Sequence, residues 1–218
     1  MQFVDTYKHK GMRKALLNTL IHKEMIAEKV IKAMEKVPRH FFLDSAFLEQ
    51  AYLDKAFSIG EGQTISQPST VAFQTELLDV QAGDKILEIG TGSGYQSCIL
   101  LELGAILYTI EYNKKLHQQA KNILNQIGYK ANFVCGDGSQ GLARFAPFDK
   151  IIVTAGAPKV PQTLIEQLKN GGVMVIPVGD NEVQQMYRIQ KTLKGEIIIY
   201  KHEAFSFVPL LGKEGWQL

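Results

Sequence analysis

The chain has 218 residues, of which 45% are hydrophobic and 21% are charged. These proportions are typical of a globular domain, and they exclude a disordered, collagen-like or membrane-spanning chain. The 24 lysines and arginines nearly balance the 22 aspartates and glutamates, which leaves a net charge of +2. We therefore expect neither a nucleic acid nor a membrane as partner.

The two cysteines, Cys98 and Cys135, are far apart and have no histidine or second cysteine at metal-binding spacing. They favour neither a disulfide framework nor a metal site, and we expect both to pack in helix and strand interiors. No basic segment followed by an apolar run opens the chain, so we expect an untargeted, cytoplasmic protein. Because no linker divides the sequence, we expect one domain over residues 1–218.

The first section, residues 1–68, is predicted to be a helical cap followed by a loop. Apolar residues recur at spacings of three and four between residues 11 and 54, which is the pattern of amphipathic helices. Pro38 ends the second of these helices. Residues 58–68 are rich in Gly and Ser, which indicates a loop before the next helix.

Strand-like and helix-like segments alternate in the second section, residues 69–180. Strands are predicted at residues 85–89, 106–112, 132–135, 150–154 and 173–178, and helices at residues 95–103, 115–127 and 163–169. Such alternation is typical of a parallel sheet with helices on both faces. The predicted fold class is therefore α/β, a doubly wound, Rossmann-like sheet with an N-terminal helical extension.

The last section, residues 181–218, is predicted to be antiparallel. Residues 184–193 and 196–202 flank Lys194-Gly195, and this spacing indicates a hairpin at the edge of the sheet. A final extended segment, residues 204–211, contains a proline. The sheet is thus expected to be mixed, and the order of its last strands stays open.

A glycine-rich turn joins the strand at residues 85–89 to the helix that follows. Gly90, Gly92 and Gly94 let the backbone turn tightly and approach a ligand, and the N-terminus of the helix offers free N–H groups. Turns of this kind also occur without a ligand, and the motif alone does not separate the two cases.

Two features favour a ligand that contains a nucleoside. Glu111 ends the next strand, about twenty residues after the first glycine, where a carboxylate accepts hydrogen bonds from ribose hydroxyls. The third glycine comes one residue earlier than in the dinucleotide fingerprint, which indicates a smaller group than a pyrophosphate. S-adenosylmethionine fits these requirements. Glu88 would place negative charge near its cationic part, or is an ordinary carboxylate at the end of a strand.

Asp137 and Gly138 follow the strand predicted at residues 132–135, at the edge of the sheet where α/β folds bind ligands. We assign both to the cofactor site, with Asp137 accepting a hydrogen bond from the adenine amino group. The alternative is an ordinary Asp-Gly turn.

Several motifs resemble those of the protein-L-isoaspartate O-methyltransferase family, in matching order along nearly the whole chain. The most specific is the run from Gly62 to Pro68, Gly-Gln-Thr-Ile-Ser-Gln-Pro, which resembles the signature loop of the family. The other matching segments are Val37-Pro38-Arg39 with Phe41, Gly136-Asp137-Gly138, Phe148-Asp149 with residues 151–155, Gly171-Gly172 with residues 177–179, and Phe207-Val208-Pro209-Leu210. The chain departs from the family at Ser69-Thr70 and Gly156, and we expect these departures to concern fine substrate preference and not the reaction.

The resemblance implies an S-adenosylmethionine-dependent enzyme. It would methylate the free α-carboxylate of isoaspartyl residues in damaged peptides and proteins and so initiate their repair. That carboxylate is already ionised near neutral pH, which agrees with the absence of a histidine in a setting typical of acid/base catalysis. The main demand on the enzyme is then the alignment of carboxylate, methyl group and sulfur.

Ser66 is the candidate catalytic residue. Its hydroxyl can donate a hydrogen bond to one oxygen of the substrate carboxylate and so direct the other oxygen. The resemblance implies the same, since the matching serine is the active-site residue of the family. Without the resemblance, an N-cap would be the commoner role of such a serine. We expect Thr64 and Ile65 to line the cofactor site, and Gln67 to contact either ligand.

Substrate binding is expected to involve Val208 and Pro209. An extended segment with these residues can lie beside a peptide and bond main chain to main chain, so that specificity depends on the β-linkage. The alternative is a strand at the sheet edge that only completes the fold.

Other functions stay open on the sequence. A second hypothesis is methylation of a small carboxylic acid or of an RNA base, of which RNA is disfavoured because no basic stripe with interleaved aromatics is present. A third is a cofactor-binding module without catalysis, which would have no need of the Ser66 loop. Isoaspartyl peptides and proteins are the expected partners. We favour a monomer, although nothing in the sequence sets the oligomeric state.

Overall fold

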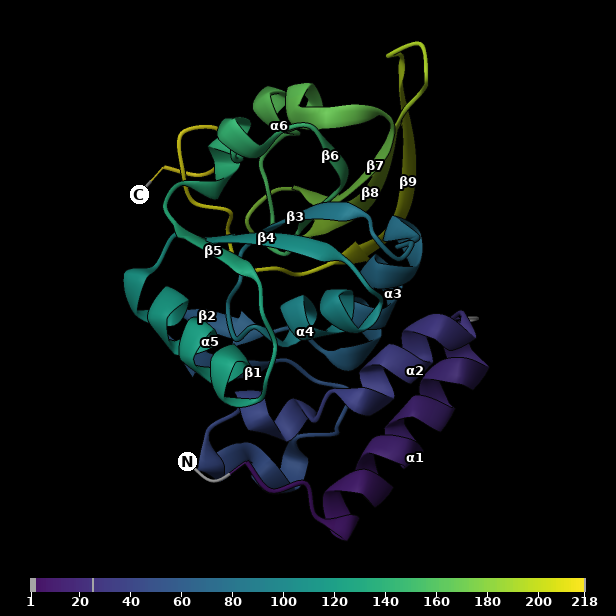
Figure 1. The fold of residues 1–218 in the computed structure, drawn as a ribbon, viewed down its shortest axis with the longest axis vertical. Helices are drawn as coiled ribbons and strands as arrows, with labels where there is room; N and C mark the ends of the chain where they lie inside the picture. Colours follow the sequence, from purple (N-terminus) through teal and green to yellow (C-terminus); the bar gives the residue numbers. More distant parts are fainter. Residues whose placement is uncertain (1–2, 25, 218) are drawn as a thin grey trace.

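A mixed seven-stranded sheet forms the centre of the molecule, with helices on both faces (Figure 1). The structure is a computed structural model that describes residues 3–24 and 26–217. The helices are α1 (Tyr7–Glu24), α2 (Glu28–Lys36), α3 (Pro68–Leu78), α4 (Tyr95–Glu102), α5 (Lys114–Gln126) and α6 (Gln162–Gln167), with 3₁₀ helices η1 (Arg39–Phe42), η2 (Ser45–Gln50), η3 (Gly138–Gln140) and η4 (Ala143–Phe145). The strands are β1 (Phe57–Gly60), β2 (Gln63–Ile65), β3 (Lys85–Ile89), β4 (Ile106–Glu111), β5 (Asn132–Cys135), β6 (Phe148–Val153), β7 (Leu168–Gly179), β8 (Gln184–Lys191) and β9 (Ile197–Phe205).

The order of the strands in the sheet is β5-β4-β3-β6-β7-β8-β9. β3 pairs in parallel with both β4 and β6. β4 and β5 therefore lie on one side of β3, and β6 to β9 lie on the other. The carboxyl ends of β3, β4 and β6 flank a topological switch point, where open α/β sheets bind ligands. β8 and β9 pair antiparallel at one edge. The doubly wound mixed sheet and the hairpin around Lys194-Gly195 are therefore confirmed.

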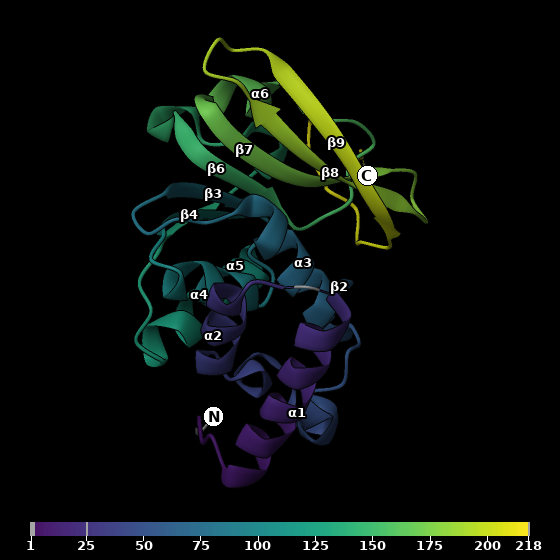
Figure 2. The same cartoon turned by 90° about the vertical axis from the view of Figure 1, so that its right-hand side faces the viewer.

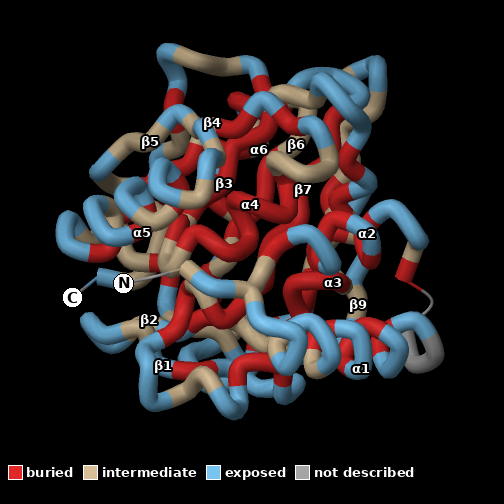
Figure 3. The backbone as a smooth tube through the Cα atoms, turned by 60° about the horizontal axis from the view of Figure 1, so that its bottom comes forward, coloured by how far each residue is buried: buried red, intermediate tan, exposed pale blue. Residues whose placement is uncertain are grey.

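The alternation of side chains along the strands divides the core into two layers. Ile86 and Ile152 belong to the layer that packs against α3 and α4, and Leu87 and Ile151 belong to the layer that packs against α6. Figure 2 shows α3, α4 and α5 on one side of the sheet and α6 on the other. The central strands are buried along most of their length (Figure 3), as expected for parallel strands covered on both faces.

The N-terminal cap consists of α1, α2 and the two 3₁₀ helices that follow. Val30 and Met34 of α2 are buried in one cluster with Leu20 of α1. α2 ends at Lys36, before Pro38, as predicted. Residues 39–42 form η1 and residues 45–50 form η2, so this part of the chain does not continue the predicted α-helical pattern. Within the described ranges, no helix combines the length and the apolar character needed to cross a bilayer.

The Gly-rich stretch at residues 58–68 contains a small antiparallel hairpin, and not only the predicted loop. Its strands β1 and β2 are joined by Gly60, Glu61 and Gly62, which have φ angles of 89°, 55° and 68°. All three are left-handed, a conformation that glycine adopts without steric cost. The hairpin places residues 64–66 at the edge of the central sheet. Strands of four and three residues are too short to show a periodic pattern in the sequence.

After β9 the chain returns to the carboxyl end of β6, and we call residues 206–217 the C-terminal segment. Gly156 holds it: the Gly156 N–H donates to the Val208 carbonyl at 2.8 Å, and the Gly156 carbonyl accepts from the Leu210 N–H at 2.8 Å. The same carbonyl accepts from the indole N–H of Trp216 at 3.0 Å. The C-terminal segment is therefore fixed at the edge of the sheet that carries the switch point.

The two cysteines differ in their surroundings. Cys98 is fully buried in α4, whereas Cys135 is exposed at the end of β5. The expectation of interior packing is thus wrong for Cys135. The reason is that β5 is the edge strand of the sheet and is only partly covered.

Candidate active site

A cavity of about 250 Å³ lies at the carboxyl edge of the sheet, close to the lower end of the range of about 300–1,000 Å³ for small-molecule sites. Its wall combines the β1–β2 hairpin, the glycine turn after β3, the end of β4 and the C-terminal segment. The predicted site residues that line it are Thr64, Ile65, Ser66, Gly90, Gly92, Glu111, Gly138, Val208 and Pro209. The predicted residues that do not line it are Gln67, Glu88, Gly94 and Asp137.

The glycine turn needs its glycines for two different reasons. Gly90 has a φ of +92°, and a Cβ atom there would lie 2.5 Å from the Thr154 hydroxyl, which donates to the Gly90 carbonyl at 2.6 Å. Gly94 has a φ of +89°, and its Cβ would lie 2.4 Å from the side chain of Leu124. Gly90 therefore keeps the turn close to β6 at the cavity wall, whereas Gly94 lets α4 pack against α5 and does not reach the cavity.

Glu111 fixes the turn to the end of β4. One carboxylate oxygen accepts from the Gly92 N–H at 2.8 Å, and the other accepts from the Asn113 N–H at 2.9 Å. The side chain lines the cavity, although only 7% of the residue is exposed. Because each carboxylate oxygen can accept more than one hydrogen bond, the group keeps acceptor capacity for hydroxyls of a ligand.

Glu88 does not reach the cavity, in contrast to the predicted charge beside the cofactor. It is fully buried on the face of the sheet covered by α4, where it accepts from Thr109 Oγ1 at 2.7 Å and from the hydroxyl of Ser97. Burial raises the pKa of Glu88 to about 7; the two hydroxyl donors oppose this shift and the nearby charge of Glu111 adds to it. The residue therefore belongs to a polar network beneath the glycine turn.

Asp137 is turned away from the predicted adenine contact. One carboxylate oxygen accepts from the backbone N–H and the hydroxyl of Ser139, at 2.9 and 2.7 Å, and the other accepts from the Lys213 N–H at 2.8 Å. The carboxylate thus anchors the C-terminal segment. Gly138 does line the cavity, and a Cβ atom there would lie 2.6 Å from the side chain of Ile89.

Ser66 follows β2 and is half-buried at the cavity wall. The N-cap residue of α3 is Gln67, so the alternative role of Ser66 as a helix cap is wrong. Among the described residues, none forms a hydrogen bond with the Ser66 hydroxyl, which leaves it available to a ligand. The Gln67 side chain instead donates to the hydroxyl of Ser69 at 3.0 Å.

Comparison with known proteins decides the family of the chain. Residues 11–215 match the model of the family described as protein-L-isoaspartate(D-aspartate) O-methyltransferase (PCMT). The chain belongs to this family.

Two bacterial relatives match it over nearly their full length. A protein-L-isoaspartate O-methyltransferase of Cytophaga hutchinsonii is 58% identical over 212 residues, which cover 97% of this chain and 96% of the relative. That of Christiangramia forsetii is 50% identical over 208 residues, 95% of this chain and 97% of the relative. A solved structure of a protein-L-isoaspartate O-methyltransferase has a TM-score of 0.83 at 30% identity, over 93% of this chain and 66% of that chain.

A second solved structure agrees in fold. It is a Plasmodium falciparum protein named as a protein-L-isoaspartate O-methyltransferase, in complex with S-adenosyl-L-homocysteine, with a TM-score of 0.77 at 24% identity over 91% of this chain and 98% of that chain. The family, the fold class and the methyltransferase function predicted from the sequence are confirmed by these comparisons.

Two glutamines complete the cavity of this PCMT family member and were not predicted. Gln74 of α3 and Gln96 of α4 both line it and are almost fully buried. The Gln74 amide nitrogen donates to the Val153 carbonyl at 3.0 Å, which ties α3 to the end of β6. A glutamine on a helix is usually exposed, so the sequence carries no signal for either residue.

A further contact joins the hairpin to α5. The Glu61 carboxylate, at the turn between β1 and β2, pairs with the Lys115 ammonium at 2.7 Å. Glu61 and Asn113 both line the cavity. Exposed ion pairs contribute little to stability, about 0–1 kcal/mol, so the hairpin is held to α5 by a weak contact.

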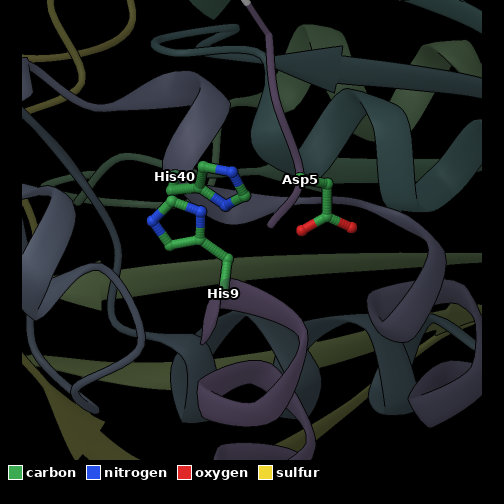
Figure 4. Close-up of side chains that lie close together, drawn as sticks. All are labelled: Asp5, His9 and His40. Atoms are coloured by element: carbon green, nitrogen blue, oxygen red, sulfur yellow. The ribbon is translucent and has the colours of Figure 1, made fainter. Parts of the chain in front are cut away.

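A separate cluster in the N-terminal cap contains Asp5, His9 and His40, whose potential ligand atoms lie within 4.8 Å of one another (Figure 4). The two imidazole rings stack with 3.8 Å between centroids. Both Asp5 oxygens accept from Arg13, at 2.8 and 3.2 Å. The nitrogens of His40 lie 2.8 Å from the Tyr52 hydroxyl and 3.2 Å from a backbone carbonyl. These contacts occupy the carboxylate of Asp5 and both ring nitrogens of His40, which are two of the three groups that would bind a metal ion. Burial lowers the pKa of His40, which favours its neutral form.

Proposed function

We propose that this chain transfers a methyl group from S-adenosylmethionine to the free α-carboxylate of isoaspartyl residues in damaged peptides and proteins. The observation that carries the proposal is the cavity, in which Ser66 lies in one wall with the glycine turn and the C-terminal segment. Membership of the PCMT family over residues 11–215 supports the same reaction. As a consequence, the chain would initiate the repair of its substrates.

The residues around the cavity fit S-adenosylmethionine, which supplies an electrophilic methyl group on a sulfonium when bound. Glu111 would hold the ribose hydroxyls with its remaining acceptor capacity. The glycine turn and the N-terminus of α4 would hold the carboxylate of the amino acid head, since free N–H groups and the helix dipole favour an anion there. Gly90 and Gly138 let the backbone of this wall lie close to Thr154 and Ile89, because a Cβ atom at either position would collide with these side chains.

Ser66 would orient the substrate. Its unengaged hydroxyl can donate to one oxygen of the isoaspartyl α-carboxylate and leave the other oxygen as the nucleophile. No general base is required, since the reference pKa of such a carboxyl group is about 3.3–3.9. In agreement with this, none of the described histidines lines the cavity.

Val208 and Pro209 would bind the substrate backbone. Gly156 engages the Val208 carbonyl and the Leu210 N–H, so successive carbonyls along this extended segment face opposite sides. Among the described residues, no donor reaches the Pro209 carbonyl, which leaves it free to accept from a peptide N–H. Recognition through main-chain groups would make selection depend on the β-linkage and less on neighbouring side chains.

The test is transfer of labelled methyl from S-adenosylmethionine to two peptides that differ only in aspartate or isoaspartate. Label on the isoaspartyl peptide alone supports the proposal. Equal label on both peptides would point to another acceptor, such as a small carboxylic acid, and cofactor binding without transfer would indicate a binding module.

Ser66→Ala tests the assigned role directly. We expect it to lower turnover by roughly tenfold or more, as for a lost hydrogen bond to a charged group, with cofactor affinity nearly unchanged. The exposed Ser45→Ala on η2 is the matched control and is expected to retain activity. A loss of cofactor affinity with unchanged turnover in Ser66→Ala would contradict the assignment.

We also propose a cytoplasmic monomer that binds no nucleic acid. Cys98 and Cys135 are not joined in a disulfide, as in most proteins of a reducing compartment, and the net charge is only +2. Light scattering of the purified protein measures the mass in solution, and a value at twice the mass of the chain or more would contradict the monomer.

A further inference from the structure

Gln96, in the first turn of α4, is a buried side chain that lines the cavity. Only 7% of the residue is exposed. Among the residues that the structure describes, no group donates a hydrogen bond to its Oε1 atom, which is itself buried. Buried amide oxygens without a donor are costly and rare in native proteins, so this one requires a physical reason.

The neighbours of Gln96 fix the orientation of its amide. The hydroxyl of Thr75 donates to the Val71 carbonyl at 2.7 Å, so its only proton is engaged. It therefore has to accept from Gln96 Nε2, which lies 3.0 Å away. Thr75 is 1% exposed and does not line the cavity. Since α3 holds the amino end of the amide, the oxygen is the end that is left for a ligand.

An acceptor at this place selects a ligand with a donor. Carboxylates only accept hydrogen bonds, so neither the substrate carboxylate nor that of the cofactor suits Gln96. The cofactor proposed above has three kinds of donor: the ribose hydroxyls, the adenine amino group and the ammonium of its amino acid head. A charged donor satisfies a buried oxygen best, because charge-assisted hydrogen bonds are the strongest.

The order of the strands assigns these donors to different places. In the proposed complex the ribose hydroxyls bind Glu111, which ends β4, and the adenine lies beside Gly138, which follows β5. β4 and β5 lie on one side of β3, whereas α3, which orients Gln96 through Thr75, contacts β6 and β7 on the other side. The ammonium group is thus the donor that remains for Gln96.

We propose that Gln96 Oε1 accepts a hydrogen bond from the α-ammonium group of S-adenosylmethionine and makes that group a requirement for tight binding. This inference rests on the proposed function. It gives Gln96 a role in selection, because adenosine thioethers without the amino acid head, such as 5′-methylthioadenosine, cannot satisfy the buried oxygen.

The test is calorimetric titration with S-adenosylhomocysteine and with its deamino derivative, two ligands that differ only in the ammonium group. We expect the wild-type protein to bind S-adenosylhomocysteine roughly ten- to a hundred-fold more tightly. Gln96→Met keeps the length of the side chain without the amide oxygen. In this variant the preference is expected to fall to about twofold or less, with the affinity for the deamino derivative retained.

Two further variants separate binding from folding effects. Thr75→Val removes the acceptor that orients the amide, and it is expected to reduce the preference although the amide is still present. Gln118→Leu replaces an exposed glutamine of α5 and is expected to keep the wild-type preference. If Gln96→Met does not fold, Gln96→Asn, whose shorter amide cannot reach the same place, replaces it with the same expected loss of preference.

Equal losses of affinity for both ligands in the Gln96 variant would overturn the inference, as would a wild-type protein without any preference. Methyl transfer by the wild type to an isoaspartyl peptide is measured in the same preparation. Intact transfer without a ligand preference overturns only the role of Gln96, whereas absence of S-adenosylhomocysteine binding by the wild type overturns the proposed function.

Discussion

Replacement of the buried Glu88 by Gln is expected to change how the stability of the protein depends on pH. The pKa of Glu88 is raised from 4.5 to about 7, mainly by burial. Between these two values the folded chain keeps a proton that the unfolded chain has released. The contribution of Glu88 to the free energy of unfolding is therefore largest at acidic pH and falls as the pH rises towards 7.

The magnitude follows from the two pKa values. They differ by about 2.5, which corresponds to about 3 kcal/mol of stability lost once the folded carboxyl group has ionised. The ionisable groups that face Glu88 are Glu111 from β4, which raises its pKa, and Cys98 from α4. Burial raises the pKa of Cys98 well above its ordinary value, so the thiol stays neutral in the same range.

The assay is urea unfolding, followed by circular dichroism, at several values from about pH 5 to about pH 8. Over this range the wild type is expected to lose about 2–3 kcal/mol relative to Glu88→Gln, because the amide cannot ionise. Glu35→Gln, on the exposed side of α2, removes a carboxylate without touching the buried network and serves as control. A constant difference between wild type and Glu88→Gln across the range would refute the reasoning, as would a wild type that gains stability relative to the variant.

Three other outcomes follow from the structure. Gly90→Ala places a Cβ atom 2.5 Å from the Thr154 hydroxyl at a φ of +92° and is expected to destabilise the fold by about 1–3 kcal/mol; an unchanged melting temperature would contradict this. Asp137→Ala removes the acceptor of the Lys213 N–H, so residues 206–217 should be cleaved faster in limited proteolysis, and equal cleavage would exclude the anchoring role. Zinc should not raise the melting temperature, because Arg13 already pairs with Asp5; a rise would establish a metal site.

The predicted residues that line the cavity are those whose positions depend on neighbouring residues in the sequence. The turn with Gly90 and Gly92 is a local motif, and Glu111 follows from the rule that parallel strands end at the same edge. Ser66 was predicted from its family motif and lines the cavity, although the loop that carries it is partly a hairpin. In each case the residues that set the backbone path lie within a few positions of the side chain.

No local pattern encodes the contacts of Glu88 and Asp137, which do not line the cavity, or of Gln96, which was not predicted. The carboxylate of Asp137 binds the backbone of Lys213, 76 residues further on, and no spacing rule connects the two. Glu88 lies next to the glycine turn in sequence, but its side chain is on the face covered by α4, and the alternation along a strand does not tell which face borders a ligand. Gln96 is a single residue on a helix, and only the hydrogen bonds around it mark it as unusual.

Trp216 is an intrinsic fluorescence probe of the C-terminal segment. It is the only tryptophan of the chain, and its indole is fixed to Gly156 at the point where the C-terminal segment meets the sheet. The emission of an indole shifts with the polarity and mobility of its surroundings. Binding of a peptide beside Pro209, as proposed above, would disturb the segment to which the ring belongs. It could therefore be followed by tryptophan fluorescence without an attached dye.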